Sequence, residues 1–156
     1  GAARVVRQRS DVQFVLLGDG PLRTEVEARV RDLDLEDHVH LAGWRDDAYR
    51  LLAAADVVTL TSRWEGTPYA LLEAMAWSLP VVATAVNGCP EVVREAETGF
   101  LVPPGDATTW AEKVIEVLAD PTRASTMGRQ GRNHVEARFT LQQMVTRIEE
   151  LYHQAV

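Results

Sequence analysis

Residues 57–84 read VVTLTSRWEGTPYALLEAMAWSLPVVAT and contain, in one stretch, the pattern that decides the fold. Two short apolar runs, 57–60 and 80–84, are rich in valine and have the length of buried strands. Between them, residues 68–78 are apolar nearly all round, which indicates a helix that packs on several sides. Strands that are apolar on both faces are typical of parallel sheets covered by helices. The stretch therefore predicts a strand–helix–strand unit with a right-handed crossover.

The same alternation continues on both sides of this unit. Further strands are expected at residues 12–17, 39–43 and 100–102. Helices are expected in the amphipathic stretches at 22–33, 46–54, 90–95, 106–119, 121–138 and 141–153. This order predicts the α/β class, as a three-layer doubly wound parallel sheet of the Rossmann-like type. No linker or repeat interrupts the pattern, so residues 1–156 are expected to form a single domain.

Composition and charge exclude several classes of protein. With 46% hydrophobic and 25% charged residues, the chain has the make-up of a globular domain. Its formal net charge of -7 argues against a nucleic-acid partner, because a phosphate backbone would be repelled. No apolar run reaches the roughly 20 residues of a membrane span, and the first residues lack the apolar core of a signal peptide. The single cysteine, Cys89, cannot form an internal disulfide and favours a reducing, cytoplasmic location.

Ligands of doubly wound sheets bind beyond the carboxyl ends of the strands, where each loop enters the next helix. Among the loops in such positions, the one at 61–68 is the most informative. Pro68 suits the first turn of a helix, and Gly66 and Thr67 leave backbone N–H groups free at the helix entry. A helix N-terminus without a bulky side chain over it favours a phosphate group, through these donors and the helix dipole.

Two carboxylates flank this helix entry. Glu65 stands beside the expected phosphate site, so it is expected to bind sugar hydroxyls, because an ionised carboxylate only accepts hydrogen bonds. Glu73 is the only charged residue from 68 to 80, in an apolar helix, which predicts a buried carboxylate with partners such as a ribose diol. The alternative is that Glu73 faces water on a narrow stripe while Glu65 accepts from the helix-entry amides.

The spacing of Glu65 and Glu73, with seven residues between them in EGTPYALLEAMA (65–76), resembles the signature of the family 4 retaining glycosyltransferases. The resemblance continues in order through nearly the whole chain. It covers VLLGDGP (15–21), VHLAG (39–43), ADV (55–57), PVVAT (80–84), NGCPEVV (87–93) and TGFLVPPGD (98–106). It implies the two-domain GT-B fold, with this chain as the C-terminal half, which binds the nucleotide-sugar donor.

By this resemblance each candidate residue has an implied role. Glu65, the catalytic candidate, would hold hydroxyls of the donor sugar, and Glu73 would hold the ribose. Backbone amides that would face the sugar and diphosphate belong to Gly66, Thr67, Tyr69, Ala70 and Leu71. Residues that would line the nucleobase or lie close to it are Gly18, Gly20, Gly43, Trp44 and Arg45. The donor would be a UDP- or GDP-linked sugar, transferred with retention and without a metal or other cofactor, and the leaving phosphate would deprotonate the acceptor.

The sequence departs from the family pattern at its start. A domain of this type opens with an additional strand and a loop that carries an arginine and a lysine against the diphosphate, and this sequence starts after them, at Gly1. We therefore expect a domain truncated on its N-terminal side, without its first strand and its acceptor-binding half, that binds nucleotide without turnover. Self-association through an apolar surface is expected from residues at helical spacing: Phe139, Leu141, Met144, Ile148 and Leu151.

Two alternatives stay open. The chain could be a non-catalytic nucleotide-binding or assembly module that keeps the scaffold, or a nucleotide-sugar epimerase built on the same fold. Thr67 stands where the family often has a larger apolar residue, so the resemblance leaves the sugar open. A full-length enzyme could also lie peripherally at the inner face of a membrane.

Overall fold

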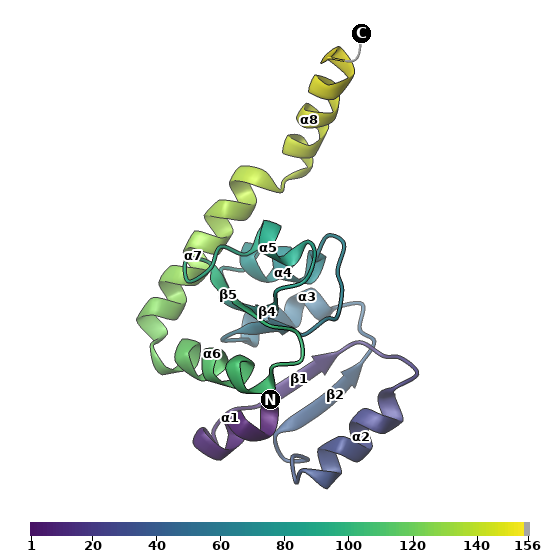
Figure 1. The fold of residues 1–156 in the computed structure, drawn as a ribbon, viewed down its shortest axis with the longest axis vertical. Helices are drawn as coiled ribbons and strands as arrows, with labels where there is room; N and C mark the ends of the chain where they lie inside the picture. The colour runs from purple at the N-terminus through teal and green to yellow at the C-terminus, as the bar shows by residue number, and fades with distance from the viewer. Residues whose placement is uncertain (155–156) are drawn as a thin grey trace.

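Every strand and helix expected from the sequence is present in the computed structural model, which describes residues 1–154. The first residues form one more short helix. The elements are α1 (Ala2–Gln8), β1 (Phe14–Leu17), α2 (Arg23–Asp32), β2 (Val39–Gly43), α3 (Ala48–Leu51), η1 (Leu52–Ala54), β3 (Val58–Leu60), α4 (Tyr69–Ala76), β4 (Val81–Thr84), α5 (Cys89–Val92), β5 (Gly99–Val102), α6 (Ala107–Ala119), α7 (Pro121–Arg138) and α8 (Leu141–Gln154). Figure 1 shows their arrangement.

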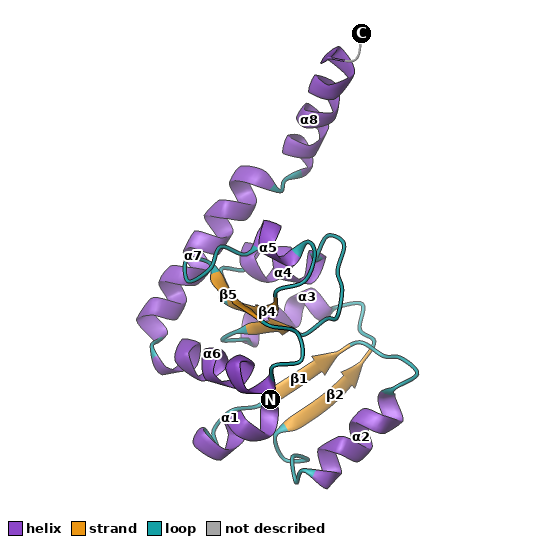
Figure 2. Ribbon diagram, in the orientation of Figure 1, coloured by secondary structure: helices purple, strands orange, loops and turns teal. Residues whose placement is uncertain are grey.

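All strand pairs are parallel, but the strands form two sheets (Figure 2). β1 pairs with β2, with Phe14 opposite Val39, and β3, β4 and β5 form a second sheet in that order. The usual doubly wound order of six strands is 3-2-1-4-5-6, in which the first strand lies between the second and the fourth. Without that first strand, the remaining five would divide into a pair and a triplet. The observed pair and triplet correspond to the parts of this order that lie on either side of its first strand.

β1 has the apolar composition of an interior strand, but helices do not fully cover its side chains. Val15, Leu16 and Leu17 are apolar, yet 55%, 39% and 42% of their surfaces are exposed. In contrast, all four residues of β4 are buried, because that strand has a partner on each side and helices on both faces. The α/β class with parallel strands is thus confirmed, and the two sheets differ in how completely they are covered.

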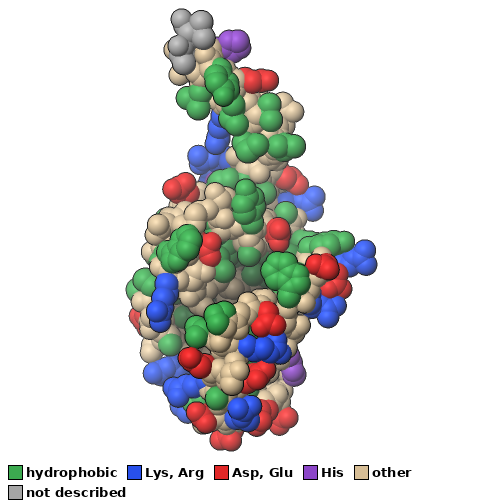
Figure 3. Space-filling model, turned by 90° about the vertical axis from the view of Figure 1, so that its right-hand side faces the viewer, with side chains coloured by type: hydrophobic (Ala, Val, Ile, Leu, Met, Phe, Trp, Pro, Cys, Tyr) green, Lys and Arg blue, Asp and Glu red, His purple; other side chains and the backbone are tan. Residues whose placement is uncertain are grey.

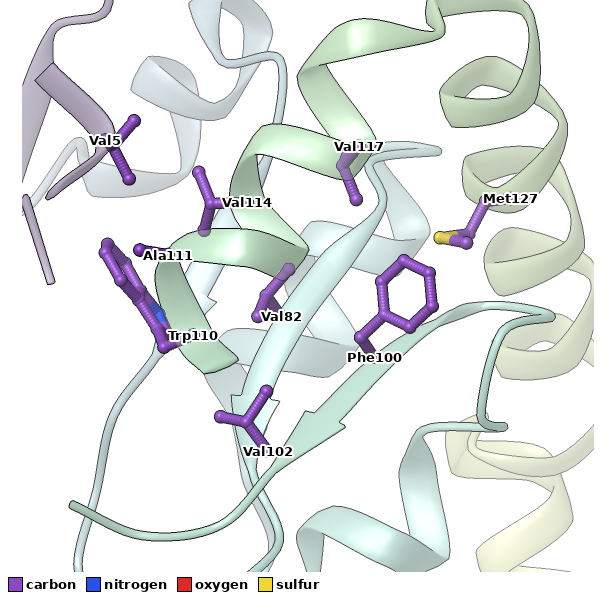
Figure 4. Close-up of a cluster of buried hydrophobic side chains, with 9 residues drawn as sticks. All are labelled: Val5, Val82, Phe100, Val102, Trp110, Ala111, Val114, Val117 and Met127. Carbon is purple, nitrogen blue, oxygen red and sulfur yellow. The ribbon is translucent and has the colours of Figure 1, made fainter. Parts of the chain in front are cut away.

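The core lies on the two faces of the three-stranded sheet. Because successive side chains of a strand alternate, Val82 of β4 points to the α6 side, whereas Val81 and Ala83 point to the α4 side. Figure 4 shows the first cluster, made of Val5, Val82, Phe100, Val102, Trp110, Ala111, Val114, Val117 and Met127. The second cluster contains Leu71, Ala74, Met75, Val81, Ala83, Val86, Cys89, Val92 and Val93. These clusters hold α4 and α6 against the strands and so fix the loops at the strand ends.

The last helix, α8, extends away from the body of the molecule (Figure 1). It buries none of its side chains, although it carries several large apolar ones. Those at least 37% exposed are Leu141, Met144, Val145, Ile148, Leu151 and Tyr152. Among residues 1–154, no helix is both long enough and apolar enough to cross a membrane.

Candidate functional site

The candidate site lies at the carboxyl end of the three-stranded sheet. The loop after β3 (residues 61–68) and the loop after β4 (residues 85–88) are neighbours, because β3 and β4 pair in parallel. Figure 3 shows the face toward which the arrowheads of β1 and β2 point in Figure 1. Hydrophobic side chains and carboxylates gather around a hollowed area in the middle of this face.

Glu65 is held in place by a short chain of hydrogen bonds. The Ser62 hydroxyl donates to Oε1 of Glu65 at 2.6 Å. The hydroxyl of Thr84, at the end of β4, donates to the Ser62 carbonyl oxygen, also at 2.6 Å. Thr84 is 3% exposed and belongs to the central strand, so it anchors the loop firmly. Oε2 of Glu65 accepts no hydrogen bond within residues 1–154 and keeps its lone pairs available for hydroxyl donors.

The entry of α4 leaves some of its backbone amides free. Pro68, which has no N–H, is the residue before the helix. The N–H of Tyr69 donates to the Thr67 carbonyl oxygen at 2.9 Å, and that of Leu71 donates to the Pro68 carbonyl oxygen at 3.0 Å. In the part of the chain that the structure describes, the N–H groups of Gly66, Thr67 and Ala70 have no protein acceptor. Of the five amides expected at the diphosphate, three are therefore unpaired and two are used within the turn.

The position of Glu73 differs from the buried one expected of it. It is exposed and makes no hydrogen bond or ion pair with any residue between 1 and 154. The reason is the orientation of α4, which buries Leu71, Ala74 and Met75 and turns its other face to solvent. Residues of this open face are Tyr69, Ala70, Glu73, Ala76 and Trp77. The burial argument for Glu73 is thus wrong, and the solvent-facing stripe is the arrangement observed.

That stripe nevertheless brings the candidate residues together. Tyr69 and Glu73 are four residues apart and share one side of the helix, next to the free amide of Ala70. Leu71 is different, since it is fully buried in the core and its N–H is occupied. The accessible carboxylate of Glu73 can accept hydrogen bonds from a diol, and the free amides at the helix entry can donate hydrogen bonds to phosphates.

The candidates near β1 and β2 form a second group. The N–H of Gly18 donates to the Gly43 carbonyl oxygen at 2.8 Å, which joins the ends of the two strands. Gly43 has a φ of 69°, and a Cβ at that position would lie 3.2 Å from the Arg23 guanidinium. Gly20 donates to the Asp19 side chain at 2.8 Å, in the same turn. Gly18 has a φ of 117°, so at both strand ends the backbone conformation favours glycine.

Trp44 and Arg45 come directly after Gly43 in the chain. Trp44 is 78% exposed, and its indole N–H donates to Asp46 at 3.2 Å. Arg45 makes two hydrogen bonds of 2.8 Å to Asp47, which hold the pKa of that carboxyl below its usual range. An exposed indole offers a flat surface for stacking. Within residues 1–154 no side-chain hydrogen bond or ion pair links this group to Glu65 or Glu73.

Three supporting residues were not identified from the sequence. Ser62 and Thr84 act across the β3–β4 pair, so their role depends on strand order. Gly88 lies against Gly66, which likewise depends on how two loops meet. Beside Gly88, Cys89 is fully buried in the α4-side core. Burial, together with the charge of Glu65, raises the pKa of its thiol and keeps it protonated.

Comparison with known proteins agrees with this architecture. The family model described as "Glycosyl transferases group 1" matches residues 2–120. The N-acetyl-alpha-D-glucosaminyl L-malate synthase of Bacillus anthracis is 36% identical over 143 residues, which are 92% of this chain and 38% of that protein. The chain thus spans about two fifths of the length of this curated relative.

Solved structures show the same fold. The Anabaena protein Alr3699/HepE, in complex with UDP, superposes with a TM-score of 0.91 at 27% identity, over 98% of this chain and 44% of that one. The C-terminal domain of a glycosyl transferase group 1 family protein (LpcC) from Francisella tularensis superposes with a TM-score of 0.79 at 26% identity, over 90% of this chain and 76% of that one. From the family match and the shared architecture, this chain belongs to the group 1 glycosyl transferases.

Proposed function

We propose that this chain is the donor-binding domain of a retaining glycosyltransferase, which transfers a sugar from a nucleoside diphosphate to an acceptor. The observation that carries the proposal is the arrangement around α4. A carboxylate held by Ser62, three unpaired amides at the helix entry and an accessible second carboxylate lie along one loop and one helix face. These are the groups that sugar hydroxyls, a diphosphate and a ribose diol require.

Each group has a defined role in this proposal. Glu65 accepts hydrogen bonds from the donor sugar through its free oxygen, and the amides of Gly66, Thr67 and Ala70 donate to the diphosphate. Glu73 accepts from the two ribose hydroxyls. Charge on the leaving diphosphate is stabilised by these fixed donors, which need no reorganisation during the reaction. The leaving phosphate then takes the proton of the acceptor on the same face of the sugar, which gives retention.

UDP is the nucleotide we favour over GDP. The support comes from the Anabaena neighbour, whose structure holds UDP at 27% identity to this chain. The acceptor-binding site is proposed to lie in the remainder of a longer protein. The relatives possess such a remainder beyond the two fifths that this chain spans. The complete enzyme is therefore proposed to have a preceding acceptor-binding half, and this chain alone is proposed to bind nucleotide without turnover.

Calorimetric titration of the chain with UDP, GDP, ADP and NAD tests the proposal. Saturable binding of UDP is expected, and Glu73→Ala should weaken it roughly ten- to a hundredfold, since hydrogen bonds to a charged group are lost. Glu112→Ala is the matched control, because Glu112 is also an exposed helical glutamate. Equal UDP affinity in the two variants, or tight binding of NAD, would contradict the proposal. Release of free nucleotide without any acceptor would point to the epimerase. Ligand binding without any transfer in the full-length protein would point to the non-catalytic module.

Glu65 allows a second test that separates sugar from nucleotide. Glu65→Gln keeps the shape of the side chain but removes its charge. We expect it to weaken binding of the UDP-sugar while the affinity for UDP itself stays unchanged. A parallel loss of affinity for both ligands would show that Glu65 supports the loop and does not contact the sugar.

The exposed face of α8 is proposed to pair with a second copy of this chain. Leu141, Met144, Ile148 and Leu151 recur at spacings of three and four residues, as in a two-helix seam. Sedimentation velocity should show a concentration-dependent dimer, which the double substitution Met144→Glu, Ile148→Glu abolishes. Thr146→Glu, on the opposite side of the helix, is the control and should leave the dimer intact. A monomer at all concentrations would refute the pairing.

A further inference from the structure

Gly88 lies in close contact with the loop that carries Glu65. A Cβ added to Gly88 would overlap the carbonyl oxygen of Gly66 and would lie 3.0 Å from the carbonyl carbon of that residue. It would also lie 3.3 Å from Cδ of Pro68. Gly88 itself is buried. No residue with a side chain therefore fits at this position unless one of the two loops moves.

The loop that carries Gly88 has little freedom to move. The N–H of Ala85 donates to the Val102 carbonyl oxygen of β5 at 2.8 Å, and the N–H of Val86 donates to the Thr84 carbonyl oxygen at 2.8 Å. The N–H of Cys89 donates to the Val86 carbonyl oxygen at 2.9 Å, and the Cys89 side chain is fully buried. A side chain added at 88 would therefore displace the other partner, which is the exposed segment around Gly66.

The contact determines how the peptide group between Gly66 and Thr67 is oriented. Every peptide bond in the described chain is trans, so the C=O of Gly66 and the N–H of Thr67 point in opposite directions. Since the carbonyl oxygen faces Gly88, the N–H of Thr67 is directed away from the loop after β4. Thr67 is exposed, and its N–H donates to no acceptor within residues 1–154. If this peptide group were reversed, a carbonyl oxygen would take the place of the donor.

We infer that Gly88 is a positioning residue for the diphosphate of the donor. Gly88 has only a hydrogen atom where other residues have Cβ, so the Gly66 carbonyl can pack against it. This contact holds the Thr67 N–H outward as a fixed donor to phosphate oxygen. Fixed donors are worth more than mobile ones, because no free energy is spent on orienting them when the ligand binds. The inference rests on the proposed function and adds to it a residue that never touches the ligand.

Gly88→Ala tests this role, and Gly128→Ala is a matched control. A Cβ on Gly128 of α7 would overlap the carbonyl oxygen of Ser78, so the substitution creates the same kind of steric clash with a backbone carbonyl. Ser78 lies just past the C-terminal end of α4, whereas Gly66 precedes its N-terminal end. Both variants should lower the temperature of thermal unfolding. Only Gly88→Ala should change the geometry of the candidate site.

The discriminating measurement compares UDP with uridine, which lacks the diphosphate. In the unmodified chain, UDP should bind more tightly than uridine, and the Thr67 amide cross-peak in ¹⁵N spectra should shift when inorganic pyrophosphate is added. In Gly88→Ala, the advantage of UDP over uridine should fall roughly ten- to a hundredfold, the range for one charge-assisted hydrogen bond. The affinity for uridine should stay the same. Gly128→Ala should keep both affinities and the pyrophosphate response of Thr67.

The possible failures are distinguishable. One outcome is that the unmodified chain binds UDP while Gly88→Ala keeps the same ratio of UDP affinity to uridine affinity. In that case the positioning role is refuted and the proposed function stands. Equal losses in Gly88→Ala and Gly128→Ala would attribute the effect to general destabilisation and would also refute the role. If the unmodified chain binds neither UDP nor pyrophosphate, the proposed function fails, and the role of Gly88 fails with it.

Discussion

Replacing Thr84 by valine tests whether the central strand supports the candidate catalytic carboxylate. The substitution keeps the shape of the side chain and removes one hydroxyl group. That hydroxyl donates to the Ser62 carbonyl oxygen at 2.6 Å, and Ser62 in turn donates to Glu65 at 2.6 Å. Loss of the donor leaves the carbonyl oxygen of the half-buried Ser62 without its partner, next to a Thr84 side chain that is 3% exposed.

The size of the effect follows from two opposing terms. A polar group left unpaired when its partner is removed costs about 1–3 kcal/mol. The added methyl group returns at most about 0.8 kcal/mol through burial of apolar surface. A net loss of about 0.2–3 kcal/mol is expected, which for a domain of this size lowers the unfolding temperature by up to roughly 12 °C. Because the Ser62 carbonyl is no longer held, the affinity for UDP-sugar should fall more than the affinity for UDP.

Circular dichroism during heating and calorimetric titration measure the two effects, with Thr98→Val as control. Thr98 is fully buried, and its hydroxyl oxygen accepts from the Arg94 backbone N–H at 2.9 Å, remote in sequence from the candidate site. We expect Thr98→Val to lower the unfolding temperature without changing the ratio of UDP-sugar to UDP affinity. An unaltered unfolding temperature in Thr84→Val would refute the energetic argument. An identical change of the affinity ratio in both variants would refute the link to Glu65.

Two further predictions concern stability. Burial, followed by the nearby charges of Arg94 and Arg138, lowers the pKa of His134, so the folded chain holds this ring neutral. Between that lowered pKa and the unfolded value of about 6.5, the unfolded chain binds more protons, so the free energy of unfolding rises with pH and is lost on acidification. His134→Leu should flatten this slope in urea unfolding below about pH 6.5, and an unchanged slope would contradict the assignment. Asp106→Ala should cost about 1–2 kcal/mol in urea unfolding, because the Asp106 carboxylate caps α6 by accepting from the N–H groups of Thr108 at 3.1 Å and Thr109 at 3.0 Å. Asp106→Asn, which keeps the acceptor, should recover most of that loss, and a full loss in the asparagine variant would argue against the cap.

The elements and the class of fold could be predicted because their signals are local. Valine-rich runs at 57–60 and 80–84 form β3 and β4, and the periodic stretches at 106–119 and 121–138 form α6 and α7 with nearly the expected bounds. The loops at the strand ends were likewise foreseeable, since parallel strands direct their carboxyl ends to one side. Glu65, Gly66 and Thr67 therefore lie at the edge of the sheet where they were expected.

Glu73 shows where a local signal is not sufficient. Its helix is apolar nearly all round, which indicated burial on every side. Alanine, however, is small enough to face either core or solvent, and α4 buries Leu71, Ala74 and Met75 while Ala70 and Ala76 remain open. The direction in which the helix turns depends on the surfaces of β3, β4 and α7 that it meets. The amino-acid composition of the helix alone therefore does not predict which of its faces is buried.

By itself, then, the sequence determined which segments are strands and helices, the parallel α/β class and the loop that carries the candidate chemistry. Only the tertiary structure decided that the sheet divides between β1 and β3, that Thr84 supports Glu65 through Ser62, and that Gly88 faces the Gly66 carbonyl. The physical reason is the range of the interactions. Secondary structure follows from the spacing of apolar residues a few positions apart, whereas these contacts join segments roughly twenty residues apart, whose meeting depends on strand order and packing.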